Sequence, residues 1–364
     1  MSLLIRNIGT LLSGDVRAPK LSASSIFVEG ETIAAIGEER TADLTIDAGG
    51  GLVAPGLWDA NHHAYFGDHS PEMDPRGYLD RTVRAGVTSI VSSGTTDLPG
   101  RTNDAVGAKM LAILSARSWR YDRPRDVKMH AGTVIATAGL TDKDFADLKA
   151  AGVERLSFME PVATTAEAKR LAAAARASGL KVMARVGGVK LIDDAASVGE
   201  ALRAIQPDVA CHVNGGPVPA PSDVLEWLAG ASSCALDLSL LGSPRIAAEI
   251  ATQALERDQP ERLVLSSNTP SPGAIAPAGV PYMLQLLTST TKASPEMAVA
   301  FASGNAARAY GLPGGVIKVG QPADVFIGRP AEYSPFQDSL EALANGALAI
   351  TTVIIDGTVQ YSTD

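Results

Sequence analysis

Residues 52–63 read Leu-Val-Ala-Pro-Gly-Leu-Trp-Asp-Ala-Asn-His-His, an apolar run that ends in a cluster of polar side chains. The apolar part has the composition of a buried strand. The polar part places carboxylate, amide and imidazole groups where that strand ends. Since parallel α/β folds gather functional side chains at the carboxyl ends of their strands, the stretch predicts the first strand of such a fold and one edge of its site.

Seven further runs rich in β-branched residues follow this one, separated by Ala- and Leu-rich stretches of helical period. Eight strand-helix units in series predict an α/β fold, a (β/α)₈ TIM barrel with its active site at the carboxyl ends of the strands. An open, doubly wound sheet is the alternative. The eight predicted strands are Leu52–Asp59, Thr88–Ser93, Val127–Ile135, Arg155–Met159, Lys181–Val186, Asp208–Val213, Ala235–Leu240 and Arg262–Ser267.

The two ends of the chain differ from its middle. Residues 1–54 and 314–364 alternate short apolar pairs with Gly, Asp and Thr, and Asp356-Gly357 is a hairpin signal. Neither end is large enough to bury an apolar face alone. We therefore expect the two ends to form one small β-sandwich domain, with residues 55–313 forming the barrel.

Composition excludes several classes of protein. The chain has 364 residues, 46% of them hydrophobic and 20% charged, and a formal net charge of −9, which rules out a disordered chain and a cationic surface for nucleic acid or membrane. Cys211 and Cys234 lie in apolar runs, which is typical of a reducing compartment. The start lacks the pattern of a signal peptide. We expect a cytoplasmic protein with a small-molecule substrate.

A known family shares these features. The motif Pro-Gly-x-x-Asp-x-Asn-x-His at residues 55–63, with β segments at both termini, resembles the entry signature of the amidohydrolase superfamily. The chain is most similar to the enamidase branch, which opens cyclic amides of the tetrahydronicotinate type. Similar segments follow in the same order: Pro99-Gly100-Arg101, Asp104, Lys109, Val127–His130, Gly139-Leu140-Thr141, His212–Pro217 and Tyr310-Gly311-Leu312.

The resemblance implies a metal pair, which this sequence lacks the residues to hold. The family uses two histidines after strand one, a carboxylate or modified lysine after strand four, a histidine after each of strands five and six, and an aspartate after strand eight. The metals activate a water molecule and the aspartate moves its proton. In this sequence the six positions fall on Asn61, His63, Phe158, Arg185, His212 and Asn268. Only two of them, His63 and His212, keep the family's residue type.

Neighbouring residues offer little replacement. Alternation along a strand projects Asp59, Asn61 and His63 together and turns His62 the other way. Glu160 lies two residues after Phe158, so its side chain is expected on the same face of the strand as that of Phe158. A divalent ion about 5 Å from Arg185 would be repelled by about 7 kcal/mol at an effective dielectric near 20. We therefore predict no metal cofactor, and the alternative is one weakly bound zinc ion on His63, His212 and Glu160.

The substituted positions still form a polar site. Arg185 with Asn61 and Asn268 could stabilise an oxyanion, and His63 or His212 could move a proton, so these five are the predicted catalytic residues. Glu160, Asp237 and His130 are predicted to bind substrate.

Two of these substrate-binding assignments leave an alternative open. Asp237 points either into the barrel, where it would be the best remaining general base, or to the helix layer. His130 is either a substrate ligand or a packed strand residue. Ser266 shares the phase of Asn268, but the sequence places no base beside it.

The resemblance implies a homo-oligomeric hydrolase that cleaves a non-peptide C–N bond. With the substitutions, the predicted substrate is a small cyclic anionic amide, opened without the usual metal pair. A metal-independent isomerase or lyase is a variant of this prediction. The alternative is a catalytically inactive paralogue that serves as a partner or regulatory subunit.

Overall fold

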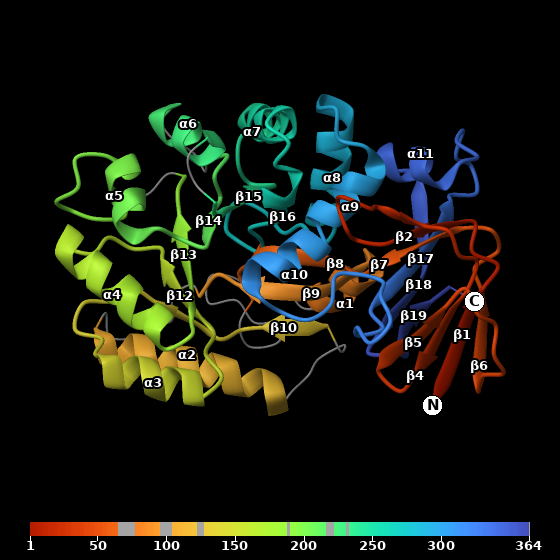
Figure 1. The fold of residues 1–364 in the computed structure, drawn as a ribbon, viewed down its shortest axis with the longest axis horizontal. Helices are drawn as coiled ribbons and strands as arrows, with labels where there is room; N and C mark the ends of the chain where they lie inside the picture. Colours follow the sequence, from red (N-terminus) through yellow and green to blue (C-terminus); the bar gives the residue numbers. More distant parts are fainter. Residues whose placement is uncertain are drawn as a thin grey trace.

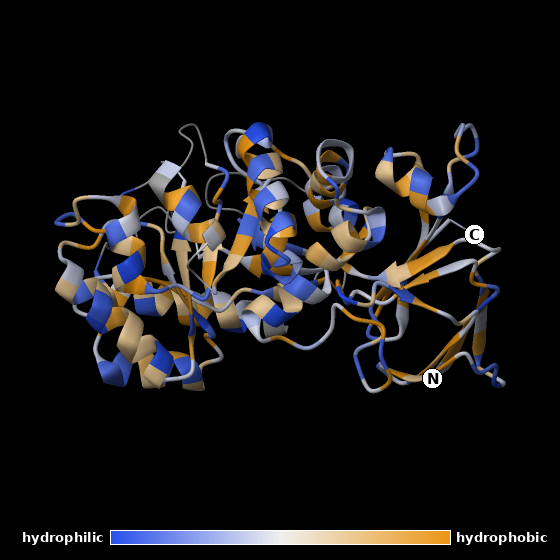
Figure 2. Ribbon diagram, turned by 45° about the horizontal axis from the view of Figure 1, so that its top comes forward, coloured by the Kyte–Doolittle hydropathy of each residue, from blue (hydrophilic) through white to orange (hydrophobic). Residues whose placement is uncertain are grey.

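A computed structural model describes residues 1–64, 77–94, 104–121, 127–187, 190–215, 222–230 and 233–363. In Figure 1 a barrel of strands surrounded by helices lies beside a β domain that contains both the N- and the C-terminus. The predicted architecture of a barrel with a β-sandwich is confirmed. Figure 2 shows apolar residues concentrated along the strands, while the helices alternate apolar and polar residues. None of the helices in the described ranges is long and apolar enough to cross a membrane.

The barrel strands are parallel and pair in sequence order. One group has the order β10-β9-β8 and the other the order β11-β12-β13-β14-β15-β16. Their bounds are β8 Leu57–His62, β9 Val87–Ser92, β10 Lys128–His130, β11 Thr133–Ile135, β12 Arg155–Phe158, β13 Lys181–Arg185, β14 Val209–Cys211, β15 Ala235–Ser239 and β16 Leu263–Ser266.

Helices connect and cover these strands, and their starts follow capping chemistry. Thr164 accepts a hydrogen bond from Glu167 N at the start of α4, and Ser294 caps α9 ahead of Pro295. The helices are α1 Tyr78–Arg84, α2 Ala105–Tyr121, α3 Asp142–Ala150, α4 Thr165–Ala177, α5 Val198–Ile205, α6 Ser222–Gly230, α7 Pro244–Glu256, α8 Gly279–Thr290, α9 Pro295–Phe301, α10 Gly304–Tyr310 and α11 Ser339–Ala344.

Two predicted strands are each divided in the structure. Leu52–Asp59 breaks at Gly56, where a Cβ atom would lie 2.1 Å from Thr88 Oγ1. Val127–Ile135 breaks at Gly132, where a Cβ atom would lie 2.5 Å from the Gly152 carbonyl oxygen. The Thr88 side chain at Gly56 and the Gly152 backbone at Gly132 leave no room for a Cβ atom where the strands break, and the single-strand predictions were wrong there.

Both ends of the chain contribute to the β domain. One sheet has the order β5-β4-β1-β6, and the other has the order β19-β18-β17-β7-β2-β3, in which β7 pairs with β17. The Asp356-Gly357 turn between β18 and β19 has positive φ at both residues, as predicted. The strands are β1 Ser2–Arg6, β2 Thr10–Leu12, β3 Lys20–Leu21, β4 Ile26–Glu29, β5 Thr32–Ile36, β6 Leu44–Asp47, β7 Leu52–Pro55, β17 Val325–Pro330, β18 Leu348–Ile355 and β19 Thr358–Ser362.

Lys128 connects the barrel to the β domain. Its ammonium on β10 lies 2.7 Å from Asp324 Oδ2 and also pairs with Asp356 in the β18–β19 turn. The Asp324 side chain is 2% exposed, and Lys128 opposes the rise that burial causes in the pKa of this carboxyl. Removal of the lysine would leave a buried carboxylate without its cation.

Lys128→Met should therefore lower the free energy of unfolding by about 3–5 kcal/mol. Lys109→Met is the matched control, because Lys109 also pairs with two carboxylates, Asp144 and Asp147, but at a more exposed place. The control should cost about 1 kcal/mol or less. Urea unfolding of both variants measures the difference, and equal losses would contradict the role of Lys128 as the buried link.

A buried seam joins the last barrel strand to the first. Asn268 N donates to the Asn61 carbonyl at 3.0 Å, and His63 N donates to the Thr269 carbonyl at 3.1 Å. The Asp59 carboxylate accepts hydrogen bonds from Ser267 N and Ser267 Oγ. Thr269 Oγ1 bonds to Ser267 Oγ at 2.9 Å, and the hydroxyl of Tyr78 on α1 lies 2.6 Å from Thr269 Oγ1. The seam fixes the ends of β8 and β16 against each other.

The seam leads to a prediction about pH and stability. Burial raises the pKa of Asp59 from 3.8 to about 7, although bonds from Ser267 oppose the shift. Between pH 4 and 7 the folded chain therefore keeps a proton that the unfolded chain has released. For this group the free energy of unfolding falls as pH rises through that window, by up to about 1.4 kcal/mol per pH unit.

Asp59→Asn removes this titration, so its stability relative to the wild type should rise from pH 4 to 7 and level off above about pH 8. Asp142→Asn, at an exposed position of α3, is the control. Urea unfolding across this pH range measures both variants. If the difference in free energy of unfolding between Asp59→Asn and the wild type stays constant across this pH range, then Asp59 has the same pKa in the folded and unfolded states, and the prediction is wrong.

Candidate active site

Four side chains meet at the carboxyl end of β8. Asn61 Nδ2 lies 3.4 Å from Asp237 Oδ2 and 3.2 Å from Asn268 Oδ1. His63 Nε2 lies 2.8 Å from the same Asn268 oxygen. All four side chains are buried. The structure thus brings together three of the five predicted catalytic residues and one predicted substrate ligand.

The hydrogen-bond directions in this cluster follow from the carboxylate. Asp237 Oδ2 accepts, so the Asn61 atom facing it is the amide nitrogen. The same Asn61 nitrogen also donates to Asn268 Oδ1. The Asn268 side-chain oxygen therefore faces both Asn61 and His63. His63 Nε2 therefore carries the proton that it shares with Asn268. The amide nitrogen of Asn268 makes no hydrogen bond within the described ranges, so it remains available as a donor.

The side chains of β8 alternate less regularly than predicted. Pairing with β9 shifts register between Asp59 and His62, which is the mark of a bulge. Asp59 turns to Ser267 and the Tyr78 side, whereas Asn61 and His63 turn to Asn268. The prediction that all three project together was wrong for Asp59, because the bulge changes the phase.

His62 faces away from Asn61 and His63, as predicted. Its ring packs edge-on against the Tyr78 ring of α1, with centroids 5.4 Å apart. Burial, with a smaller contribution from the charge of His63, lowers the pKa of His62 to about 3. His62 is therefore a neutral packing residue and cannot replace Asn61.

Asp237 on β15 points into the barrel, which decides between the two directions left open by the sequence. Its Oδ2 accepts from His212 N at 3.0 Å and from Ser239 Oγ at 3.2 Å, besides Asn61. Its Oδ1 is buried and has no hydrogen-bond partner in the described part of the chain. Burial raises its pKa to about 6, against the opposing effect of its hydrogen bonds, with Ser266 first. Such a carboxyl can both take and return a proton near neutral pH.

Ser239 is a member of the cluster that the sequence interpretation missed. Its hydroxyl bonds to Asp237 and lies 2.6 Å from Ser266 Oγ. The signal was present, because Ser239 follows Asp237 by two residues and shares its face of β15. Ser266, which the sequence left without a base, is joined to Asp237 through this hydroxyl.

His212 and Arg185 form the other side of the site. His212 follows β14 in a left-handed conformation with φ of 55°, the same value as Asn268. Burial lowers the pKa of His212 to about 3, and the positive charges of Arg185 and His63 add to the effect. The Leu241 backbone lies near the ring but without the geometry of a hydrogen bond. The positive charge of Arg185 therefore acts on groups in the site, and His212 is neutral at physiological pH.

The other two predicted substrate ligands are His130 and Glu160. The His130 ring stacks on Trp58, with centroids 5.2 Å apart, and burial, aided by Arg155 and Lys128, lowers its pKa to about 3. Glu160 lies half-buried, two residues beyond the end of β12. Roles for both in substrate binding stay predictions.

Several side chains at the positions that the resemblance assigns to metal ligands are poor ligands for a metal ion. Phe158, fully buried, offers no donor atom, and the hydrogen bond to Asn268 engages His63 Nε2. Within the described ranges no three His, Cys, Asp or Glu side chains lie close enough to hold a metal ion. The positive charge at Arg185 opposes a cation further.

Known proteins match this chain closely. The model of the amidohydrolase family matches residues 125–359. Enamidase from Eubacterium barkeri is 34% identical over 362 residues, which cover 97% of this chain and 94% of that protein. Imidazolonepropionase from Paenarthrobacter aurescens is 30% identical over 175 residues, 40% of this chain and 42% of that protein.

Solved structures agree. The crystal structure of enamidase superposes with a TM-score of 0.94 at 33% identity, covering 100% of this chain and 96% of that one. A β-aspartyl dipeptidase from Fervidobacterium islandicum reaches a TM-score of 0.69 at 16% identity, covering 100% and 96%, and shares the fold. The chain belongs to the amidohydrolase family.

Proposed function

We propose that this protein hydrolyses the C–N bond of a small, cyclic, anionic amide without a pair of metal ions. One observation carries the proposal: the buried Asp237 carboxyl is bonded into the Asn61–His63–Asn268 cluster beside the positive charge of Arg185, and its Oδ1 has no hydrogen-bond partner within the described ranges. The similarity to enamidase along nearly the whole chain supports the reaction class.

The amide carbonyl needs donors for the negative charge that develops on its oxygen. The Asn268 amide nitrogen and the Arg185 guanidinium supply such donors from fixed positions. In this role they take over the polarisation that metal ions provide elsewhere in the family. Arg185 also attracts a carboxylate carried by the ring.

Asp237 moves the proton. A water oxygen bonds to the carbonyl carbon while Asp237 Oδ1 takes one of its protons. As the C–N bond breaks, Asp237 returns that proton to the ring nitrogen, so the Asp237 carboxylate is regenerated. The product is an open chain with a new carboxylic acid, which ionises, and a nitrogen that has gained one hydrogen. A pKa of about 6 suits both transfers.

The alternative function is a catalytically inactive paralogue that acts as a partner or regulatory subunit. The substitutions at Asn61, Phe158, Arg185 and Asn268 favour it, because loss of the metal-binding residues also follows from loss of catalysis. A homo-oligomer, a cytoplasmic location and the division of domains at residues 54 and 314 stay predictions under either function.

The test uses a panel of lactams and cyclic enamides with a ring carboxylate. Wild-type protein should be stabilised against heat by mass action and should release the ring-opened product. Arg185→Met should lose the thermal shift, because the anion loses its cation. Asp237→Asn should keep the shift and lose about 10²–10⁴-fold in kcat.

The double readout separates the two functions. Full turnover in Asp237→Asn would overturn the proton-transfer role, and an unchanged shift in Arg185→Met would overturn the clamp. Neither shift nor turnover across the panel in wild-type protein would favour the inactive paralogue.

A further inference from the structure

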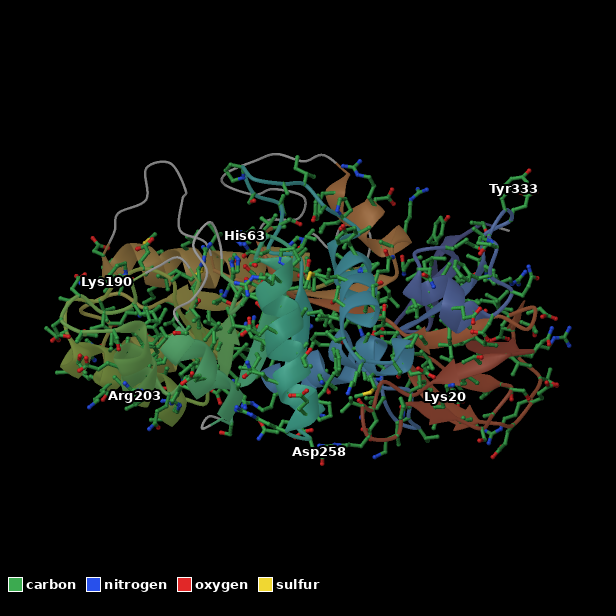
Figure 3. All side chains as sticks on the ribbon, turned by 90° about the horizontal axis from the view of Figure 1, so that it is seen from above. Lys20, His63, Lys190, Arg203, Asp258 and Tyr333 are labelled. Carbon is green, nitrogen blue, oxygen red and sulfur yellow. The ribbon has the colours of Figure 1, made fainter. Side chains whose placement is uncertain are left out.

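A second cavity lies at the opposite end of the barrel from the candidate active site. It has a volume of about 750 Å³ and is lined at the amino ends of four consecutive strands, from Lys181 at the start of β13 to Arg262 just before β16. Figure 3 shows His63 on one side of the barrel and Arg203, which lines this cavity, on the other. Its size is that of ordinary small-molecule sites.

The walls of this cavity carry more positive than negative charge. Four cationic side chains, Lys181, Arg203, Arg262 and Arg308, face two acidic ones, Asp208 and Glu261. Both acids already have cations: Asp208 lies 3.4 Å from Lys181, and Glu261 lies 2.6 Å from Arg17, which is outside the lining. The excess arises in a chain whose net charge is −9. The cavity is therefore a local positive site on an acidic protein.

The remaining arginines have no carboxylate partner in the part of the chain that the structure describes. Arg262 is buried and donates to Gln259 Oε1 at 2.8 Å and to the backbone carbonyls of Cys234, Ala229 and Leu228. Arg308 is exposed and donates to the Glu261 carbonyl at 2.7 Å and to Asn305 Oδ1 at 2.8 Å. Arg203 is exposed on α5, and its side chain forms no ion pair with the residues that the structure describes. Arg203 and Arg308 therefore keep guanidinium N–H groups that can meet an anion, whereas Arg262, whose nitrogens all donate to protein oxygens, contributes only its charge.

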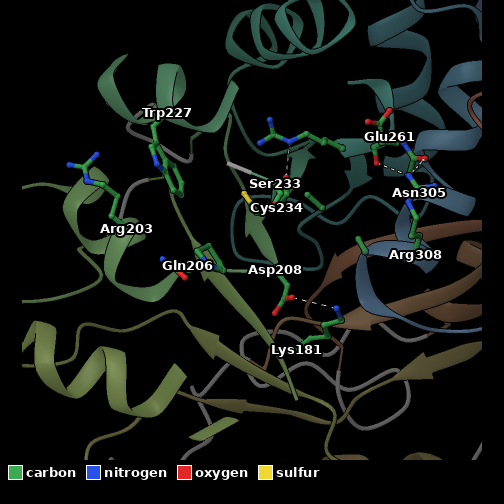
Figure 4. A pocket seen from close by; sticks show the side chains of 14 residues that line it. Lys181, Arg203, Gln206, Asp208, Trp227, Ser233, Cys234, Glu261, Asn305 and Arg308 are labelled. Atoms are coloured by element: carbon green, nitrogen blue, oxygen red, sulfur yellow. Dashed lines mark hydrogen bonds and ion pairs between the residues drawn. The ribbon is translucent and has the colours of Figure 1, made fainter. Parts of the chain in front are cut away.

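The same cavity offers a planar apolar surface. Trp227 of α6 is half-buried in its wall, with Pro207 and Ala309 among its other lining residues. Figure 4 shows Trp227 and Arg203 on one side of the space and Arg308 on the other, with the Lys181–Asp208 pair between them. A ring against the indole could thus place acidic groups toward both arginines.

We propose that this cavity is a binding site for a planar organic anion with two carboxylates, separate from the candidate active site. Its walls match such a ligand in charge and in shape. The site shares strands β13 to β16 with the active site. Lys181 begins β13 and Arg185 ends it, and Asp208 lies four residues before His212. The proposal does not depend on the proposed function.

Phthalate is the probe, measured by calorimetry and by quenching of tryptophan fluorescence in the full-length protein. Wild-type protein should bind it with quenching, whereas neutral benzamide should not bind. Arg203→Gln with Arg308→Gln should weaken binding by about tenfold or more, because two charged hydrogen bonds are lost. Trp227→Phe should abolish the quenching while heat released on binding persists.

Two controls define the site. Arg245→Gln, an exposed arginine of α7 outside the lining, should bind like the wild type. Arg185→Met should also bind like the wild type, because Arg185 lies at the other end of β13. No binding by wild-type protein, unchanged affinity in the double variant with a wild-type melting temperature, or loss of binding in Arg185→Met would each overturn the proposal.

Discussion

The buried Asp237 carboxylate sets the arrangement of the groups around it. An ion inside a barrel must be met by donors, and three of them converge on one oxygen: the Asn61 amide, the His212 backbone and the Ser239 hydroxyl. The direction of the Asn61 amide then orients Asn268, and Asn268 orients His63. A single desolvated charge thus determines the hydrogen-bond direction of the whole cluster, and it leaves the second carboxylate oxygen for a ligand.

The barrel and the β domain could be predicted because their signals are local. Each strand is a short apolar run, and Thr164, Ser294 and Asp356-Gly357 carry cap and turn chemistry in a few residues. The breaks at Gly56 and Gly132 could not be predicted. Each depends on close approach by a residue distant in sequence, the Thr88 side chain at Gly56 and the Gly152 backbone at Gly132. Only glycine leaves room for such an approach, but the glycine itself does not show which residue approaches it.

Several residues of the candidate site could be predicted from the sequence, but the hydrogen bonds between them could not. Positions carried over from the family identified Asn61, His63 and Asn268, which the structure brings together. The phase of Asp59 was wrong because a bulge is a property of two strands, not of one. Ser239 was missed because a lone serine on a strand has no chemical signature until Asp237 is known to face inward.

In the proposed function, the positive charge of Arg185 and the Asp237 carboxyl on β15 take the place of the metal ions that the resemblance implies. The account therefore depends on metal-free chemistry, and the metal content of active protein tests it most directly. Protein purified without chelator should contain well under one zinc, iron or manganese per chain by plasma mass spectrometry, and its ring-opening activity should survive exhaustive chelation. A content near two metals per chain, with activity that chelation removes and metal restores, would contradict the account.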